Sequence, residues 1–369
     1  MYSKSLLSLR LLWNNISKKH KILCAVVCVL SILAALLEAL VIITFIPFIT
    51  NISGDISLSS NQFVGILNNI YFLNFENKSV TFLIFIIFIL LSSGSRLLYI
   101  FLTTKTSARI GSYFNKKIYY KLLNKSYLEH VMQDSSYVIQ MVTSNITRTV
   151  GIISSCSLVI SGLLVTLAIL YTLILTEPLI TTLTIILLLL SYSLIYISSK
   201  GGLYQNGKTV KFNEEKIIKL VKESLDSIRE IIINNMYSTY MSEYKPLDQD
   251  LRKLQSKSTF IAQYPRYLIE CLMILIITTI AFFIGKNSSN VLPKLAVFSL
   301  GFLRMLPAIQ QIYSNLANIK TYSPSLDAIN DCLNKNQIYV ETNEDNRKDN
   351  IEIKLKKNSS NGLPIINLT

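Results

Sequence analysis

ILYTLILTEPLITTLTIILLLL, residues 169–190, consists of two apolar runs joined by Glu177-Pro178. Followed outward, the runs cover Ile152–Thr176 and Leu179–Ser198. Each has about the 20 apolar residues that a helix needs to cross the hydrocarbon core of a bilayer. Proline cannot continue the preceding helix, and its fixed φ angle suits the first turn of the next one. We therefore expect two antiparallel membrane-spanning helices joined by a tight turn.

Four further apolar runs of similar length lie on either side of this pair. Hydrophobic residues make up 51% of the 369 positions and charged residues 16%, whereas about a quarter of a soluble domain is charged. The bilayer interior has no water for unpaired backbone groups, so helices are the expected spanning structure. The sequence predicts an all-α membrane protein with six transmembrane helices. The six predicted spans are Ile22–Phe48, Val80–Leu102, Ile152–Thr176, Leu179–Ser198, Leu268–Ile284 and Leu295–Ile319.

The net charge of +14 is concentrated in two basic segments that follow the second and fourth spans. Few cations lie in the opposite connections. Loops rich in Lys and Arg stay in the cytoplasm, so we expect a multi-pass protein of the inner (cytoplasmic) membrane with both termini cytoplasmic. This distribution explains the basic excess without nucleic acid as a partner. The cations that follow these two spans include Lys105, Arg109, Lys116, Lys117, Lys121, Lys125, Lys200, Lys208, Lys211, Lys216, Lys219, Lys222, Arg229, Arg252, Lys253 and Lys257.

The two basic segments, 103–150 and 199–266, do not have the composition of ordinary loops. They contain few Gly or Pro and keep apolar residues at helical intervals, so they should continue the membrane helices into the cytosol. Their tips are expected at Tyr127–Tyr137 and Asp226–Tyr240. A projecting helical hairpin would expose its apolar stripe, so we expect a partner to cover it.

The N-terminal residues 1–20 predict a short helix that lies in the membrane interface. Leu6, Leu9, Trp13 and Ile16 recur at helical spacing ahead of the first span. The run that follows is too long for a signal-peptide core and lacks a small-x-small cleavage site, so we expect it to be a retained span.

Cysteine and histidine give no sign of a metal site or a catalytic triad. The chain has two His and five Cys, and the pair Cys24 and Cys28, four residues apart on one helix face, does not by itself make a metal site. We expect packing or lipid-facing thiols and no metal. The remaining cysteines are Cys156, Cys271 and Cys332.

Three local sequences carry a resemblance to a known family. Tyr264-Pro265-Arg266-Tyr267-Leu268-Ile269-Glu270 opens the fifth span, Arg304-Met305-Leu306-Pro307-Ala308-Ile309 lies in the sixth, and Leu37-Glu38-Ala39 precedes Ile46-Pro47-Phe48 in the first. With six spans and two long cytoplasmic segments, residues 1–330 resemble the type 1 membrane domain of ATP-binding-cassette (ABC) exporters. The similarity is to the branch that flips lipid-linked oligosaccharides or exports polysaccharide.

This resemblance implies a swapped homodimer in which the two tips are coupling helices that contact ATPase domains. The second coupling helix would contact the ATPase domain of the partner. The resemblance also implies that the dimer carries a lipid-linked anionic substrate across the membrane. The residues assigned by resemblance to the coupling helices are Tyr127, Leu128, Glu129, Asp134, Ser135 and Tyr137 in the first, and Ser227, Arg229, Glu230 and Ile231 in the second.

The end of the chain departs from the pattern of a complete exporter. A polar linker, 331–350, leads into 351–369, which is similar to the first strands of a nucleotide-binding domain. No GxxxxGK[ST] sequence is present, so we expect no ATP hydrolysis by this chain alone. ATP and Mg²⁺ would be bound by a partner, and either truncation or a separate ATPase subunit would explain the ending.

Ionisable residues inside spans cost about 2.5–3.5 kcal/mol each and therefore need a function or a partner. We hypothesise that Arg304, Arg266 and Arg96 line the substrate cavity and bind a pyrophosphate, because guanidinium groups bind phosphate oxygens bidentately. In the alternative interpretation they pair structurally with Glu38 or Glu270, which we expect to be structural residues.

Three other functions remain open. The cargo could be a peptide or a hydrophobic drug, whose cavity would use aromatics and Met rather than several Arg. The chain could be a membrane-embedded enzyme of glycan assembly, although its acidic residues are scattered and Glu214-Glu215 is the only adjacent pair before the C-terminal tail. It could also be an inactive remnant that assembles with an intact copy.

Overall fold

The structure is a computed structural model that describes residues 2–53, 78–176, 178–284 and 291–334. These residues are helical apart from short turns, and they contain no strand. The chain divides into one unit, Met1–Cys332, and a second, Leu333–Thr369. Almost all of the second unit lies outside the described residues, as do the predicted strands at 351–369 and nearly all of the predicted linker at 331–350.

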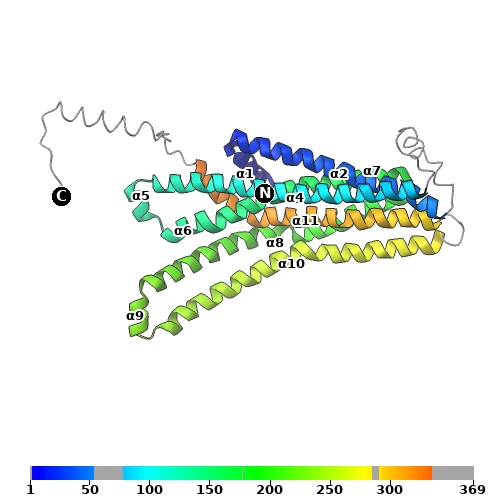
Figure 1. Cartoon of the computed structure of the whole chain (residues 1–369). Coiled ribbons are helices and arrows are strands. Elements are labelled where there is room, and N and C mark those ends of the chain that lie inside the picture. The colour runs from blue at the N-terminus through cyan, green and yellow to red at the C-terminus, as the bar shows by residue number, and fades with distance from the viewer. Residues whose placement is uncertain (1, 54–77, 177, 285–290, 335–369) are drawn as a thin grey trace, which may run out of the picture. The chain divides into compact units, whose positions relative to one another are not determined.

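Long helices form the first unit, and each predicted span falls inside one of them (Figure 1). Helix α7 ends at Thr176 and α8 begins at Pro178, where proline occupies the first helical position. In chain order the helices are α1 (Tyr2–Asn15), α2 (Lys18–Ser53), α4 (Lys78–Leu123), α5 (Tyr127–Met132), α6 (Ser135–Gln140), the π-helix η2 (Met141–Asn145), α7 (Ile146–Thr176), α8 (Pro178–Asp226), α9 (Ile228–Ile233), α10 (Tyr237–Ile284) and α11 (Val291–Asn334).

Four helical segments in the described part of the chain are long and apolar enough to cross a membrane. This is the expected character of an all-α membrane protein. The predicted spans Leu179–Ser198 and Leu295–Ile319 lie in α8 and α11 and are not among the four, so the number six stays a prediction. The four segments are Lys18–Ile49, Ser79–Leu123, Ser135–Thr176 and Tyr237–Thr279.

The apolar core lies where α2, α7 and α11 meet. Ile42 of α2, Ile169 and Leu173 of α7, and Phe302 and Met305 of α11 are all buried in one cluster. Between helices in lipid the hydrophobic effect contributes little, so this cluster is stabilised by close van der Waals contact.

One glycine sets a close approach between α8 and α11. A Cβ atom on Gly207 would overlap the backbone carbonyl of Thr321, which cannot move as a side-chain tip can. The two helices can therefore lie this close only because position 207 has no side chain.

The first and last helices of the unit are joined by hydrogen bonds. The Ser8 hydroxyl of α1 donates to Asp327 Oδ1 at 2.5 Å, and Asn330 Nδ2 donates to the Ser8 carbonyl oxygen at 2.8 Å. Leu12 and Ile16, which are one helical turn apart in sequence, are both buried, while Trp13 is exposed. The start of the chain is thus fastened to the end of α11.

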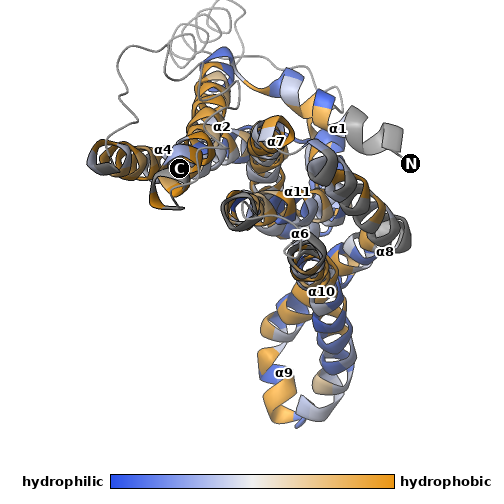
Figure 2. Ribbon diagram, turned by 90° about the vertical axis from the view of Figure 1, so that its right-hand side faces the viewer, coloured by the Kyte–Doolittle hydropathy of each residue, from blue (hydrophilic) through white to orange (hydrophobic). Residues whose placement is uncertain are grey.

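The short helices α5, α6 and α9 lie at the same end of the unit (Figure 1). Helices α8 and α10 pack against each other and carry α9 away from α2, α4 and α7, as the view in Figure 2 shows. Both predicted tips are therefore turning points between long helices, and they project from one end of the bundle.

Candidate functional site

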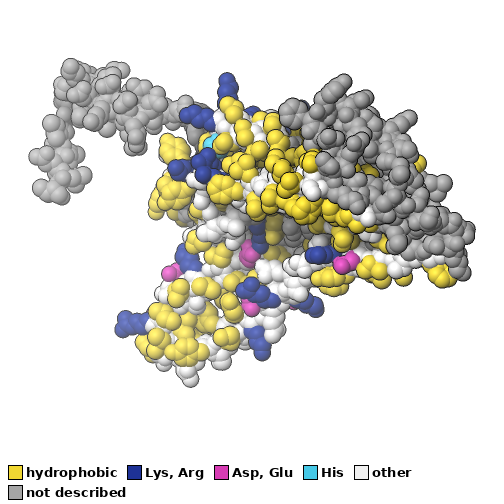
Figure 3. Space-filling model, turned by 45° about the vertical axis from the view of Figure 1, so that its right-hand side comes forward, with side chains coloured by type: hydrophobic (Ala, Val, Ile, Leu, Met, Phe, Trp, Pro, Cys, Tyr) yellow, Lys and Arg dark blue, Asp and Glu magenta, His cyan; other side chains and the backbone are white. Residues whose placement is uncertain are grey.

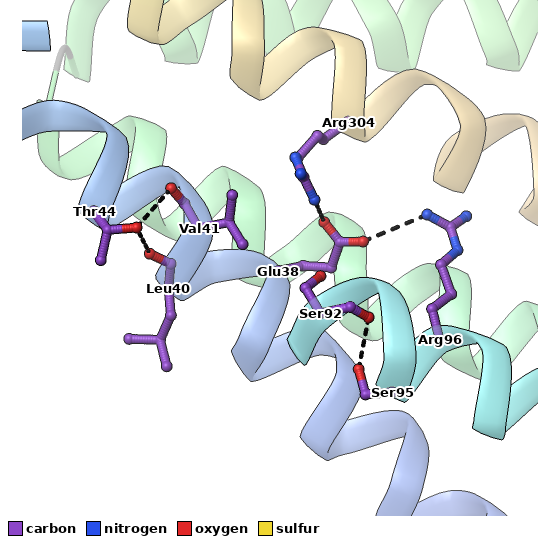
Figure 4. Close-up of polar contacts among 8 residues, drawn as sticks. All are labelled: Glu38, Leu40, Val41, Thr44, Ser92, Ser95, Arg96 and Arg304. Carbon is purple, nitrogen blue, oxygen red and sulfur yellow. Dashed lines mark hydrogen bonds and ion pairs between the residues drawn. The ribbon is translucent and has the colours of Figure 1, made fainter. Parts of the chain in front are cut away.

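Glu38 of α2 is the centre of a charged cluster inside the bundle (Figure 4). Its Oε2 accepts a hydrogen bond from Arg304 Nη1 of α11 at 2.6 Å, and its Oε1 lies 3.4 Å from Arg96 Nη1 of α4. Helix α4 presents Arg96 one turn after Ser92, and the hydroxyl of Ser95 is turned back to the Ser92 carbonyl at 2.8 Å. Three helices thus bring one carboxylate and two guanidinium groups together.

The three charges are not equally exposed. The Glu38 side chain retains 5% of its accessible surface, Arg304 23% and Arg96 39%. Since one carboxylate faces two guanidinium groups, the cluster keeps one net positive charge. Arg304 makes the shorter contact with Glu38. The charge of Arg96, the more exposed arginine, is therefore less neutralised than that of Arg304.

A cavity of about 320 Å³ lies beside this cluster, between α2, α4, α7 and α11. Glu38 and Arg96 line it, whereas Arg304, which donates to Glu38, is not among the lining residues. Tyr99 also lines it and donates its hydroxyl to the Ser157 carbonyl at 2.7 Å. Its other polar lining residues are Ser161, Gln310, Gln311 and Ser314.

The remaining charged residues predicted for the spans lie elsewhere. Arg266 and Glu270 are exposed on α10 and do not line this cavity. The structure therefore brings together Arg304, Arg96 and Glu38 but not the α10 pair, and the predicted role of Arg266 in substrate binding stays a prediction.

The first predicted coupling segment consists of two capped helices. Ser126 caps α5, where its hydroxyl accepts from the Glu129 N–H at 3.4 Å while Glu129 Oε2 accepts from the Ser126 N–H at 3.2 Å. Tyr127 and Leu128 follow with 84% and 66% of their surface exposed. The predicted tip is thus formed by α5 and the start of α6, with its apolar side chains exposed.

Asp134 caps α6 and holds it to α8. Hydrogen bonds from the Ser136 hydroxyl and N–H lower the Asp134 pKa to about 2, and Lys219 of α8 lies 3.2 Å from its Oδ2. Ser135 is hydrogen-bonded to Lys222 of α8, and Tyr137 is half-buried. The first tip is therefore tied to the helix that leads to the second.

The second predicted coupling segment is α9 with its flanking turns. Ser227 precedes it, Arg229 and Glu230 are exposed, and Ile231 is buried. Asn235 follows with a positive φ of 53°, a conformation that Asn tolerates better than most residues. Ile233 is 70% exposed, so α9 presents apolar surface beyond the predicted spans, as Figure 2 shows.

A second buried ion pair joins α7, α8 and α11, and the sequence pattern did not single it out. Arg148 of α7 pairs with Glu214 Oε1 of α8, and its other nitrogen lies 3.5 Å from the Ser325 hydroxyl of α11. Desolvation raises the Glu214 pKa, while Arg148 acts to lower it. The sequence signal that could have indicated this pair was weak: Arg148 lies four residues before a predicted span, and Glu214 is an acidic residue within a basic segment.

The cavity is lined by groups that can bind an anion. Its lining contains no His, Cys or Asp, and in the described residues no group of three or more His, Cys, Asp and Glu is placed to hold a metal ion. Guanidinium, amide and hydroxyl donors are the groups that bind phosphate or carboxylate oxygens. A search against models of known protein families finds none that matches this chain.

Proposed function

We propose that this chain is the membrane-spanning half of an ATP-driven exporter or flippase that moves a lipid-linked oligosaccharide, or a similar anionic amphiphile, across the membrane. The ATPase would be a partner domain or subunit, and the chain would act as a swapped homodimer with six spans. This proposal rests on the resemblance described above and on the charge of the cavity.

The single observation that carries the substrate assignment is the uneven charge beside the cavity. An unneutralised guanidinium within a span is costly unless it faces a polar cavity or meets an anion. Arg96 lies 39% exposed on the cavity wall with only a 3.4 Å contact to Glu38. A phosphate or pyrophosphate would supply the missing negative charge. The cavity is about the size of such a head group, so the lipid chain and the glycan would extend beyond it.

The exposed apolar tips support the ATPase partner. Leu128 on α5 and Ile232 and Ile233 on α9 are exposed at the same end of the unit. Large exposed apolar side chains outside a bilayer mark contact surfaces. Two such surfaces at one end suit a partner that pushes on both.

Binding of farnesyl pyrophosphate to the purified chain tests the substrate assignment. We expect it to raise the thermal unfolding temperature in detergent, with a smaller rise for farnesyl monophosphate and none for farnesol. Arg96→Gln should abolish the rise, whereas Arg252→Gln, which removes an exposed cation from α10, should leave it intact. Equal rises with farnesol would instead favour an apolar cargo.

Removing the charges of the cluster one at a time distinguishes an anion site from a purely structural ion pair. Arg304→Gln should weaken pyrophosphate binding, because the freed Glu38 carboxylate would neutralise Arg96. Glu38→Gln should tighten binding, and the double variant should restore it, because one guanidinium would then face the cavity without a carboxylate. If Glu38→Gln weakens binding as much as Arg304→Gln does, the cluster is structural and the assignment fails.

A further inference from the structure

The helices α1, α2 and α4 have a strong excess of positive charge at one end. In their described residues Glu38 is the only carboxylate, and Arg304 and Arg96 engage it within the bundle. Apart from Glu38, the cations at the start of α2 and in the second half of α4 therefore have no acidic residue on their own helices. We call five of them the basic cluster: Lys18, Lys19, Lys21, Arg109 and Lys116.

Contacts between the helices place the basic cluster at one level. The rings of His20 of α2 and Tyr113 of α4 lie 5.2 Å apart, centroid to centroid. Arg109 and Lys116 are four residues before and three after Tyr113, which is about 6 Å and 4.5 Å along the axis of α4. Lys18, Lys19 and Lys21 flank His20 within a single turn of α2. The cations of the two helices are thus neighbours around this ring pair.

None of these five cations has an ion pair with any described residue, and four of them are exposed; Lys21 is half-buried. The Lys21 ammonium lies 5.8 Å from the centroid of the Trp13 ring of α1. Trp13 itself is 47% exposed. Figure 3 shows several Lys and Arg side chains near a His in the upper part of the face in view, next to a hydrophobic surface, and others scattered over the lower part.

The basic cluster lies directly before the exposed apolar surface of α2 and beyond the exposed apolar run of α4 that ends at Phe101. On α2 the first exposed apolar side chain, Ile22, follows Lys21 directly. On α4 the exposed apolar run ends at Phe101, and Lys105 then folds back with its ammonium 5.3 Å from the Phe101 ring centroid. Tryptophan and snorkelling lysine are typical of the membrane–water interface. We therefore expect these cations to lie near the depth of lipid phosphates.

We propose that the basic cluster is a binding site for the headgroups of anionic phospholipids in the leaflet that borders this end of the bundle. Unpaired Lys and Arg at interface depth, beside an indole ring and an apolar lipid-facing surface, bind negatively charged headgroups in preference to zwitterionic ones. A soluble anion would gain the charge contacts only, whereas a lipid also covers Ile22 and Phe101. This site is separate from the cavity at Glu38 and does not depend on the transported substrate.

The chain provides its own reporter, because Trp13 is its single tryptophan. Lipids with brominated acyl chains quench indole fluorescence only when they bind next to it. In detergent solutions of the whole chain, brominated phosphatidylglycerol should quench Trp13 at a roughly tenfold lower mole fraction than brominated phosphatidylcholine. Higher ionic strength should reduce this preference, since exposed charges are screened.

Matched variants decide whether the basic cluster is responsible. The triple variant Lys18→Gln, Lys19→Gln, Arg109→Gln should lose the preference for phosphatidylglycerol. The charge-preserving variant Lys18→Arg, Lys19→Arg, Arg109→Lys should keep it, which separates charge from folding. The control removes three exposed cations from α10: Arg252→Gln, Lys253→Gln and Lys257→Gln.

Three results would overturn the proposal. Equal quenching by the two lipids would mean that no headgroup preference exists. An unchanged preference in the triple variant would place the preference elsewhere in the chain. Displacement of brominated phosphatidylglycerol by soluble glycerol phosphate would show that the cluster binds a free phosphate rather than a lipid.

Discussion

Replacing Arg148 by Ala should leave the Glu214 carboxylate charged and unpaired inside the bundle. Arg148 pairs with Glu214 Oε1, and Glu214 Oε2 is buried without a hydrogen-bond partner. The two side chains retain 13% and 17% of their accessible surface. Arg252 of α10 also acts to lower the Glu214 pKa, but among the described residues only Arg148 forms an ion pair with Glu214.

The expected loss of stability follows from this burial. Removing one partner of a buried ion pair costs about 3–5 kcal/mol, because the remaining charge is left desolvated. The residual exposure of both side chains lets some water reach the carboxylate, so the lower end, about 3 kcal/mol, is expected. The Arg148 contact with the Ser325 hydroxyl, at 3.5 Å, adds little at that length.

The loss should depend on pH, with a definite sign. Burial raises the Glu214 pKa above its ordinary value of 4.5, and Arg148 acts against this rise. A carboxyl group with a higher pKa in the folded chain contributes stability below its unfolded pKa and loses it as pH rises through the folded pKa. Without Arg148 the folded pKa rises further, so the deficit of the variant should shrink as pH falls and the carboxyl group takes up a proton.

Unfolding in mixed micelles of dodecylmaltoside and sodium dodecyl sulfate, followed by far-UV circular dichroism, measures the free energy. The double variant Arg148→Ala, Glu214→Gln should recover about 1–3 kcal/mol, because no buried charge remains. Lys253→Ala is the control, since Lys253 is exposed on α10 and has no ion pair with a described residue, so its loss should be within about 0.5 kcal/mol. Equal losses for Arg148→Ala and Lys253→Ala, with no recovery in the double variant, would refute the reasoning.

Two other substitutions test local geometry by the same measurement. Gly207→Ala should destabilise the unit by about 1–3 kcal/mol, because its Cβ would overlap the Thr321 carbonyl. Gly202→Ala is the control and should be neutral or stabilising, because there is open space around its Cβ. Equal effects of the two substitutions would mean that α8 and α11 are not in close contact. Asp134→Ala should cost about 1 kcal/mol by removing the cap of α6, while Asp134→Asn should cost less. The low Asp134 pKa of about 2 implies that the charge contributes fully above about pH 4 and is lost as pH falls toward 2.

The sequence predicted the long helices well because their signal is local. Apolar runs such as Ile152–Thr176 fall inside single helices, and the predicted turning points coincide with α5, α6 and α9. Runs of this length exclude strands on physical grounds, since an unpaired strand cannot exist in lipid. The helix break at Gln133–Asp134 and the π-helix Met141–Asn145 were not predicted, because each depends on contacts with α8 or on a single extra residue in a turn.

The candidate site was predictable as a set of residue types, with Glu38 and Glu270 as alternative partners for the arginines. A charged residue within an apolar run is visible in the sequence, so Glu38, Arg96 and Arg304 could be singled out. Which of them meet depends on the rotation of each helix about its axis, and a shift of one residue turns a side chain by about 100°. The same geometry explains why the pairing of Arg148 with Glu214 could not be predicted.

The bond between Ser8 and Asp327 gives the N-terminal helix a mechanical role. Any rotation of the last turns of α11 would pull on α1, because two hydrogen bonds clamp Ser8 to that helix. An affinity tag fused ahead of α1 would therefore act on these two hydrogen bonds, and its effect should be compared with that of an internal tag. Because Trp13 lies on α1, its fluorescence should also report movements of α11.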